Sequence, residues 1–198
     1  MELILIRHAL PLRVEKKDGT PADPGLSETG IEQARKLAQW MATEKLDAIY
    51  SSPMNRAHMT AKLLAEAKGI EIILEPGVME FDNRSSTYVP MEELRDKDYD
   101  RWRNLVTGGF EKLFNLGDFR KTVLDSLEKI ILQNSGRRVA VVCHGGIINI
   151  WAAHVLGIDK FLFFAPEYTS INRFLASGKG QRSLASLNET AHLRDPII

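Results

Sequence analysis

The chain has 198 residues, of which 44% are hydrophobic and 26% are charged, a composition typical of a folded globular protein. Its 26 basic and 26 acidic side chains give a formal net charge of zero, which excludes recruitment of nucleic acid or an anionic membrane by overall charge. The apolar runs are too short to span a membrane, and the single cysteine, Cys143, together with the lack of a leader, favours a cytoplasmic protein.

The first predicted strand ends abruptly in a cation and an imidazole. Four aliphatic residues, 3–6, are typical of a short strand buried on both faces of a parallel sheet, and Arg7 and His8 follow them directly. Because such side chains are costly to bury unpaired, we expect them to face a crevice at the carboxyl end of the strand, where ligands bind in open α/β sheets. A single pair of this kind is more often a solvated strand end, so a second one is needed.

Two helices and a short strand are predicted next. A polar loop over residues 13–24 contains Arg13, which we expect to reach back over the crevice, and Ser27 is the predicted N-cap of a helix that runs to about residue 41. A strand over 47–51 leads to Ser52-Pro53, the preferred order for opening a helix. Arg56 then lies in the first turn, where a cation opposes the helix dipole and predicts an anionic partner.

An acidic loop and an irregular segment follow the third predicted strand, residues 71–74. Glu80 lies in the loop, and residues 81–115 are charged and aromatic, which predicts a helical excursion over the carboxyl edge of the sheet. We expect this excursion to cover the site and to choose the substrate. The candidate contacts beyond the reacting group are Arg84, Tyr88 and Arg103.

The opening pattern recurs near the carboxyl end of the chain. After a long amphipathic helix over about 118–133, a β-branched strand at 138–143 runs into His144, Gly145 and Gly146, and an apolar helix over 147–156 follows. Glycines at a strand-to-helix turn let backbone N–H groups approach a ligand, and the helix amino end favours an anion. Strands at 170–176 and 183–187 form a predicted hairpin that closes the chain.

The two strand-end histidines with Arg7 and Arg56 predict an oxyanion site rather than a metal site. Guanidinium groups match phosphate oxygens, whereas adjacent arginines repel a cation, and the sequence has no His-x-x-x-His pair. The fixed positive charge should hold His8 neutral, so that it can attack phosphorus as a nucleophile. Glu80 is then a candidate acid for the leaving group, if burial raises its pKa.

These residues resemble the histidine phosphatase superfamily, which includes the cofactor-dependent phosphoglycerate mutases. The resemblance extends over nearly the whole chain and is carried by five motifs in order: Leu5-Ile6-Arg7-His8, Leu26-Ser27-Glu28-Thr29-Gly30, Ser51-Ser52-Pro53 with Arg56, Glu80, and His144-Gly145-Gly146.

The resemblance implies a role for each matched residue. His8 would be the phosphorylated nucleophile; Arg7, Arg56 and His144 would bind the phosphoryl group; and Glu80 would be the general acid. No metal or other cofactor is implied. Asp82 ranks second as the proton donor. The family usually has glycine where this chain has Ala9, and often a polar residue where it has Leu10.

The expected fold is a three-layer α/β sandwich with a mostly parallel central sheet, helices on both faces and the excursion over the carboxyl edge. We expect one domain over 1–198, with a helical cap at 81–115 inside it. The expected function is hydrolysis of a small phosphomonoester through a phosphohistidine, with inorganic phosphate as product, by a monomer or homodimer. A phosphoglycerate mutase stimulated by 2,3-bisphosphoglycerate and a phospho-ligand binding module without turnover are the alternatives.

Overall fold

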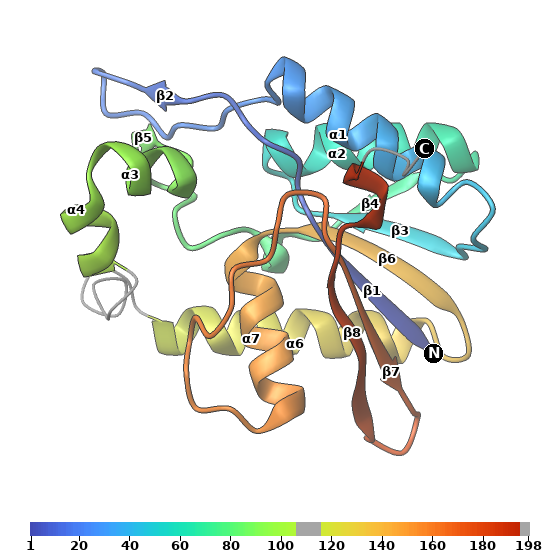
Figure 1. Ribbon diagram of the computed structural model, residues 1–198. Coiled ribbons are helices and arrows are strands. Elements are labelled where there is room, and N and C mark those ends of the chain that lie inside the picture. The colour runs from blue at the N-terminus through green and yellow to red at the C-terminus, as the bar shows by residue number, and fades with distance from the viewer. Residues whose placement is uncertain (106–115, 195–198) are drawn as a thin grey trace.

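The apolar strand at the amino end lies inside a six-stranded sheet (Figure 1). The computed structural model describes residues 1–105 and 116–194. The strands of the sheet, in spatial order, are β4 (Ile72–Leu74), β3 (Ala48–Ser51), β6 (Arg138–Cys143), β1 (Glu2–Arg7), β7 (Ile171–Ala176) and β8 (Arg182–Glu189). The first four run parallel, while β7 and β8 form the antiparallel edge, so the predicted mostly parallel sheet and closing hairpin are confirmed.

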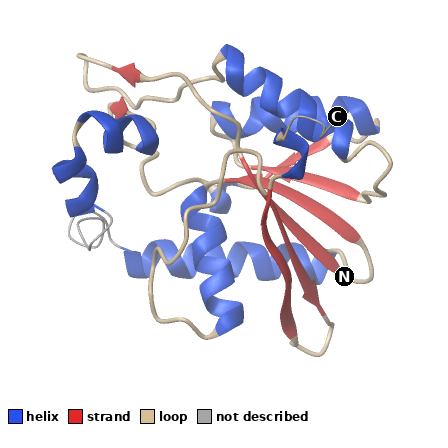
Figure 2. Ribbon diagram, in the orientation of Figure 1, coloured by secondary structure: helices blue, strands red, loops and turns tan. Residues whose placement is uncertain are grey.

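Helices cover both faces of this sheet, which confirms the three layers (Figure 2). Alternate residues of β1 point to opposite faces, as a strand requires. Ile4 and Ile6 pack in one cluster with residues of α1 (Glu28–Trp40) and α2 (Asn55–Lys68). Leu3 and Leu5 pack in the other with residues of α6 (Leu116–Gln133) and α7 (Gly145–Leu156). The strand is therefore buried from both sides, as its aliphatic run predicts.

The start of α1 agrees with the sequence, whereas the start of α2 does not. Ser27 is the N-cap of α1, since its hydroxyl accepts a hydrogen bond from the backbone N–H of Gly30 at 3.0 Å. The expected cap at Ser52 is wrong: α2 begins at Asn55, and its N-cap is Met54, which provides no side-chain cap bond. The hydroxyl of Ser52 accepts from the N–H of Met54 at 3.3 Å and lies 2.9 Å from Nε2 of His144, the residue after β6.

The excursion after β4 carries short elements beyond the carboxyl end of β1 (Figure 1). They are the 3-10 helix η1 (Pro76–Val78), the strand β5 (Thr87–Tyr88), and the helices α3 (Met91–Lys97) and α4 (Tyr99–Asn104). The strand β5 pairs with β2 (Val14–Glu15), a contact that the sequence does not predict. Residues 106–115 of the expected cap lie outside the described residues, and the division of the chain into one domain with this cap stays a prediction.

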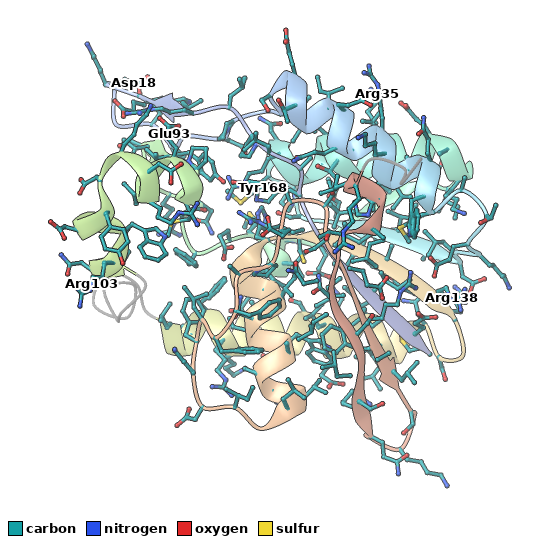
Figure 3. The ribbon with its side chains drawn as sticks, in the orientation of Figure 1. Asp18, Arg35, Glu93, Arg103, Arg138 and Tyr168 are labelled. Carbon is teal, nitrogen blue, oxygen red and sulfur yellow. The ribbon has the colours of Figure 1, made fainter. Side chains whose placement is uncertain are left out.

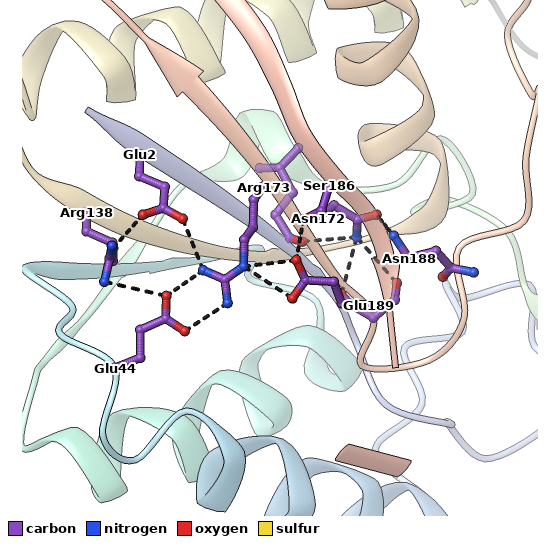
Figure 4. A network of polar contacts seen from close by, with 10 residues as sticks. Glu2, Glu44, Arg138, Asn172, Arg173, Ser186, Asn188 and Glu189 are labelled. Carbon is purple, nitrogen blue, oxygen red and sulfur yellow. Dashed lines mark hydrogen bonds and ion pairs between the residues drawn. The ribbon is translucent and has the colours of Figure 1, made fainter. Parts of the chain in front are cut away.

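An ion-pair network connects the strands on the antiparallel side of the sheet (Figure 4). The guanidinium of Arg173 on β7 donates to Glu2 of β1 at 3.0 Å, to Glu44 after α1 at 2.8 Å and to Glu189 of β8 at 3.1 Å. One side chain thus ties three strands and a loop together. The 3-10 helix η3 (Ala191–Leu193) follows β8. Among the described residues, no helix is both long and apolar enough to cross a membrane.

Candidate active site

Two histidines meet where neighbouring parallel strands end. The register of β1 and β6 pairs Arg7 with Cys143, so His8 and His144 leave the sheet side by side. Their ring centroids are 5.1 Å apart, and the two residues are only 3% and 0% exposed. The expected meeting of the two strand ends is therefore present in the structure.

Hydrogen bonds define which nitrogen of His8 is available as a nucleophile. The Nδ1 atom lies 2.8 Å from the carbonyl oxygen of Ala9, so it carries the proton and donates it there. The Nε2 atom is therefore unprotonated, and its lone pair accepts a hydrogen bond from Nε of Arg56 at 3.3 Å. Burial and the charges of Arg56 and Arg7 lower the pKa of His8 well below its usual value. The imidazole is thus neutral and nucleophilic at neutral pH.

The second histidine, His144, contacts Ser52, the serine that was expected to cap α2. Nε2 of His144 lies 2.9 Å from the hydroxyl of Ser52, and burial with the charge of Arg56 lowers its pKa. Among the described residues, no partner meets the buried Nδ1 atom of this ring. If Ser52 donates to Nε2, then Nδ1 carries a proton that can be given to an anionic oxygen.

Arg56 is a buried cation aimed at the same place. It is 1% exposed, its Nη2 atom pairs with Asp82 at 3.0 Å, and its guanidinium lies 4.5 Å from the ring centre of Tyr88. Asp82 is the anionic partner that the position of Arg56 at the helix start requires. Within the described part of the chain, its buried Nη1 atom meets no acceptor. A buried guanidinium donor in this position is suited to an oxygen of a ligand.

Arg7 forms the opposite wall of the histidine pair. Its Nη1 atom donates to the carbonyl of Pro166 at 2.6 Å, and its guanidinium lies 3.9 Å from the ring centre of Tyr168. The ring of Tyr168 is also 5.7 Å from that of His8. These contacts hold the guanidinium in one plane beside the nucleophile.

Glu80 is buried, and the amino end of α7 orients it. Its Oε2 atom accepts from the backbone N–H of Gly146 at 2.9 Å, and its Oε1 atom accepts from that of Phe81 at 3.2 Å. Burial, with a smaller contribution from the charge of Asp82, raises its pKa to about 7. The carboxyl group therefore exchanges a proton near neutral pH, as an acid that later becomes a base must do.

The unusual residues after His8 are accommodated without strain. Among the described non-glycine residues, positive φ angles occur at Thr169 and Asn188, so Ala9 does not need the conformation that favours glycine. Its N–H donates to the hydroxyl of Thr60 at 3.0 Å, and that hydroxyl donates to the carbonyl of Arg56 at 2.8 Å. Ala9 thus connects the nucleophile loop to α2.

A cavity of about 670 Å³ opens over these groups. Of the expected site residues, Arg7, His8, Arg56, Glu80, Gly145 and Tyr88 line it, as does the second-ranked acid Asp82. His144 is fully buried, and its ring centroid lies 5.1 Å from that of His8. The amino end of α7, at Gly145, faces the cavity and adds backbone donors to the two arginines.

Three of the proposed substrate contacts are not among the residues that line the cavity. Arg13 donates to Glu93 of α3 at 2.8 Å and also pairs with Glu15, so acids at the surface hold it. Arg84 is exposed and absent from the cavity wall. Arg103 lies at the outer edge of α4, whereas Tyr168 lies near the centre of the molecule (Figure 3). Their contacts with a substrate stay predictions.

Several residues that shape the site have roles that the sequence did not predict. Ser52, expected as a helix cap, and Thr60, given no role, act through their hydroxyls. Gly146, expected to offer its N–H to a ligand, donates it to Glu80 instead and leaves room for that carboxyl group. A Cβ atom on Gly146 would lie 2.3 Å from Oε1 of Glu80. The spacing from Arg56 to Thr60, one helical turn, was a usable signal because it places both on one face of α2.

Comparisons with known proteins show the family to which the chain is similar. The family model of the histidine phosphatase superfamily (branch 1) matches residues 3–190. Phosphoserine phosphatase 1 of Hydrogenobacter thermophilus is 31% identical over 206 residues, covering 98% of this chain and 94% of the relative. A probable phosphoglycerate mutase GpmB of Yersinia pestis is 25% identical, covering 100% and 97%.

A solved structure matches with the same extent. A mutant phosphoserine phosphatase of Entamoeba histolytica, in complex with phosphoserine, has a TM-score of 0.75 and 26% sequence identity. The match covers 98% of this chain and 99% of that one.

Proposed function

The chain belongs to the histidine phosphatase superfamily, and from that premise we propose that it hydrolyses a small phosphomonoester through a phosphohistidine on His8. The relatives named above support a phosphatase, and the site supplies the groups that such a reaction needs. We also expect the cytoplasm as its location. The single observation that carries the proposal is the unprotonated Nε2 atom of a neutral, buried His8 beside the guanidinium of Arg56.

In the first step, Nε2 of His8 attacks phosphorus while the ester P–O bond breaks. The guanidinium groups of Arg7 and Arg56, Nδ1–H of His144 and the N–H of Gly145 bind the oxygens on which negative charge gathers. Protonated Glu80 gives its proton to the departing alkoxide, which leaves as an alcohol. The products are a phosphorylated His8 and an ionised Glu80.

The second step reverses these roles. Ionised Glu80 takes a proton from a water molecule while the oxygen of that water attacks phosphorus, and the N–P bond breaks. His8 returns to its neutral form, Glu80 is protonated again, and inorganic phosphate is released. Positive charge from arginine side chains and from a helix amino end does the work that a metal ion performs in other phosphatases.

Hydrolysis of p-nitrophenyl phosphate by the purified chain tests the proposal. We expect turnover by the wild type and none by His8→Ala, with unchanged thermal unfolding showing that the variant is folded. Turnover by His8→Ala would overturn the assignment of His8 as the nucleophile. Binding of phosphate by the wild type without turnover would favour the binding module, and strong stimulation by 2,3-bisphosphoglycerate with 3-phosphoglycerate as substrate would favour the mutase.

A further inference from the structure

The part of the cavity away from the phosphoryl site is apolar. Four of its side chains come from α3, α4 and the residues just before α3: Val89, Met91, Leu94 and Trp102. Three more come from the loop after α7: Leu162, Phe163 and Phe164. The named side chains of these two segments are 60 or more residues apart in the chain, but they line one cavity. A leaving group attached to the bound phosphoryl group must extend between them.

Two polar side chains in this wall are already used within the protein. The carboxamide of Asn149 donates to the carbonyls of Gly145 and Phe164, at 3.0 and 3.1 Å, and accepts from the N–H groups of Phe163 and Phe164. The hydroxyl of Ser85 donates to the carbonyl of Thr87 at 2.8 Å. These groups shape the wall, so they are not free to bind a polar leaving group.

Charges that would recognise an amino acid are scarce in the same wall. Apart from the groups assigned to the phosphoryl site, its described ionisable residues are Asp82, Tyr88 and Lys160. Asp82, the only described acid in this part of the wall, is already paired with Arg56 at 3.0 Å, and the exposed Lys160 is its one described cation, so an ammonium group would find no acid that is not already paired. Phosphoserine would bring a carboxylate and an ammonium into this space, and a charge removed from water without a close partner is strongly disfavoured.

We propose that the leaving group of the natural substrate is a bulky apolar alcohol or phenol rather than an amino acid. The apolar walls exclude water from such a group and gain contact area with each carbon that enters. This inference rests on the proposed phosphatase function and narrows its substrate class. It also predicts a substrate for this chain that differs from phosphoserine, the substrate in the names of the relatives above.

A series of alkyl phosphates tests the inference without a change in leaving-group chemistry. Ethyl, butyl and hexyl phosphate release alkoxides of similar basicity, so a trend in kcat/KM reports apolar contact. A fully buried methylene is worth roughly a fourfold gain, and we expect at least about a tenfold rise from ethyl to hexyl phosphate. Phosphoserine should fall below butyl phosphate.

Matched variants locate the effect in the wall. We expect Leu162→Asn and Met91→Gln each to lower the hexyl-to-ethyl ratio by about threefold or more. Leu156→Asn, at a residue that is 43% exposed and outside the cavity wall, should leave the ratio unchanged. A flat series, or phosphoserine as the best substrate, would overturn the inference. Failure to turn over any ester, aryl phosphates included, would instead overturn the proposed function.

A different observation concerns the C-terminal segment. Thr169, which follows Tyr168, has a φ of 57°, a conformation that β-branched residues rarely adopt. Its N–H donates to the carbonyls of Arg7 and His8, at 3.1 and 3.4 Å. Its hydroxyl donates to the carbonyl of Tyr168 at 2.7 Å and lies 2.9 Å from Nε2 of buried His192. The Nε2–H of His192 thus holds a strained residue that supports the nucleophile loop.

The geometry points to His192 as a positioning residue for His8 and Arg7. Without its hydrogen bond, Thr169 is free to relax to a negative φ, which turns its N–H away from the two carbonyls. A small displacement of a nucleophile is costly, so we expect His192→Ala to lower kcat by about tenfold or more. His154→Ala, at an exposed histidine of α7, is the control and should have no effect.

Rescue by glycine distinguishes positioning from general loss of structure. Glycine adopts a positive φ at no steric cost, so Thr169→Gly no longer needs the hydrogen bond from His192. We expect the double variant His192→Ala with Thr169→Gly to recover most of the kcat lost in His192→Ala. A double variant as slow as His192→Ala, or a His192→Ala enzyme with normal kcat, would overturn this role.

Discussion

The raised pKa of Glu80 makes a specific prediction for the pH dependence of catalysis. Phosphorylation of His8 by an alkyl phosphate needs Glu80 in its protonated form, and its pKa is about 7. The protonated fraction falls to roughly one tenth at pH 8 and about one hundredth at pH 9. Because kcat/KM reports the first irreversible step, kcat/KM for ethyl phosphate should fall tenfold per pH unit above about 7.

Protonation of His8 should not limit the rate until the pH is well below the ordinary pKa of histidine. Its pKa is lowered by burial and by the charges of Arg56 and Arg7, so it stays neutral as the pH falls through 6.5, the ordinary value for histidine. The second ionisation of a phosphate monoester, near pH 6, is essentially complete at pH 8 and above, so it does not produce a decline there. The basic limb therefore belongs to the enzyme.

Two comparisons assign that limb to Glu80. The p-nitrophenolate ion leaves without a proton, so kcat/KM for p-nitrophenyl phosphate should lack the basic limb. Glu80→Gln should lower kcat/KM for ethyl phosphate by about 10²- to 10⁴-fold, the usual contribution of a general acid, and should remove the limb. A basic limb that persists in Glu80→Gln, or an equal loss for both esters, would refute the role of this carboxyl group.

Three further outcomes follow from the same site. Gly146→Ala places a Cβ atom 2.3 Å from Oε1 of Glu80, so it should impair hydrolysis of ethyl phosphate much more than of p-nitrophenyl phosphate. Equal effects on the two esters would contradict this, and Gly178→Ala, at a glycine with open space around it, is the control. Arg56→Lys removes the planar fork and should lower kcat/KM by about 10²-fold or more, whereas the exposed Arg35→Lys should not; near-normal activity of Arg56→Lys would remove Arg56 from the site. Treatment with EDTA should leave the rate unchanged, and a loss that divalent metal restores would point to a metallohydrolase.

Patterns that act within a few residues could be predicted from the sequence. The aliphatic runs that become β1 and β6 identify buried parallel strands, and the residues directly after them identify the site. Ser27 is recognised as a cap because its partner, Gly30, is three residues away. Glu80 is found because it follows a strand, although its raised pKa depends on the fold around it.

Contacts between distant segments could not be predicted in this way. Ser52 has the local signature of a helix cap, but a histidine 92 positions later uses its hydroxyl. Arg13 was expected over the crevice, whereas Glu93, 80 positions away, holds it at the surface. The pairing of β2 with β5 involves only two residues in each strand, too few for a periodic pattern. In each case the partner is set by tertiary structure.

The most direct test of the proposed chemistry is to identify the phosphorylated residue during turnover. The enzyme is mixed with p-nitrophenyl phosphate, quenched in alkali within milliseconds to preserve a phosphoramidate, and examined by mass spectrometry. We predict a single phosphoryl group on His8 that is absent from His8→Ala. A phosphoryl group on another residue, or turnover without any phosphorylated enzyme, would contradict the account.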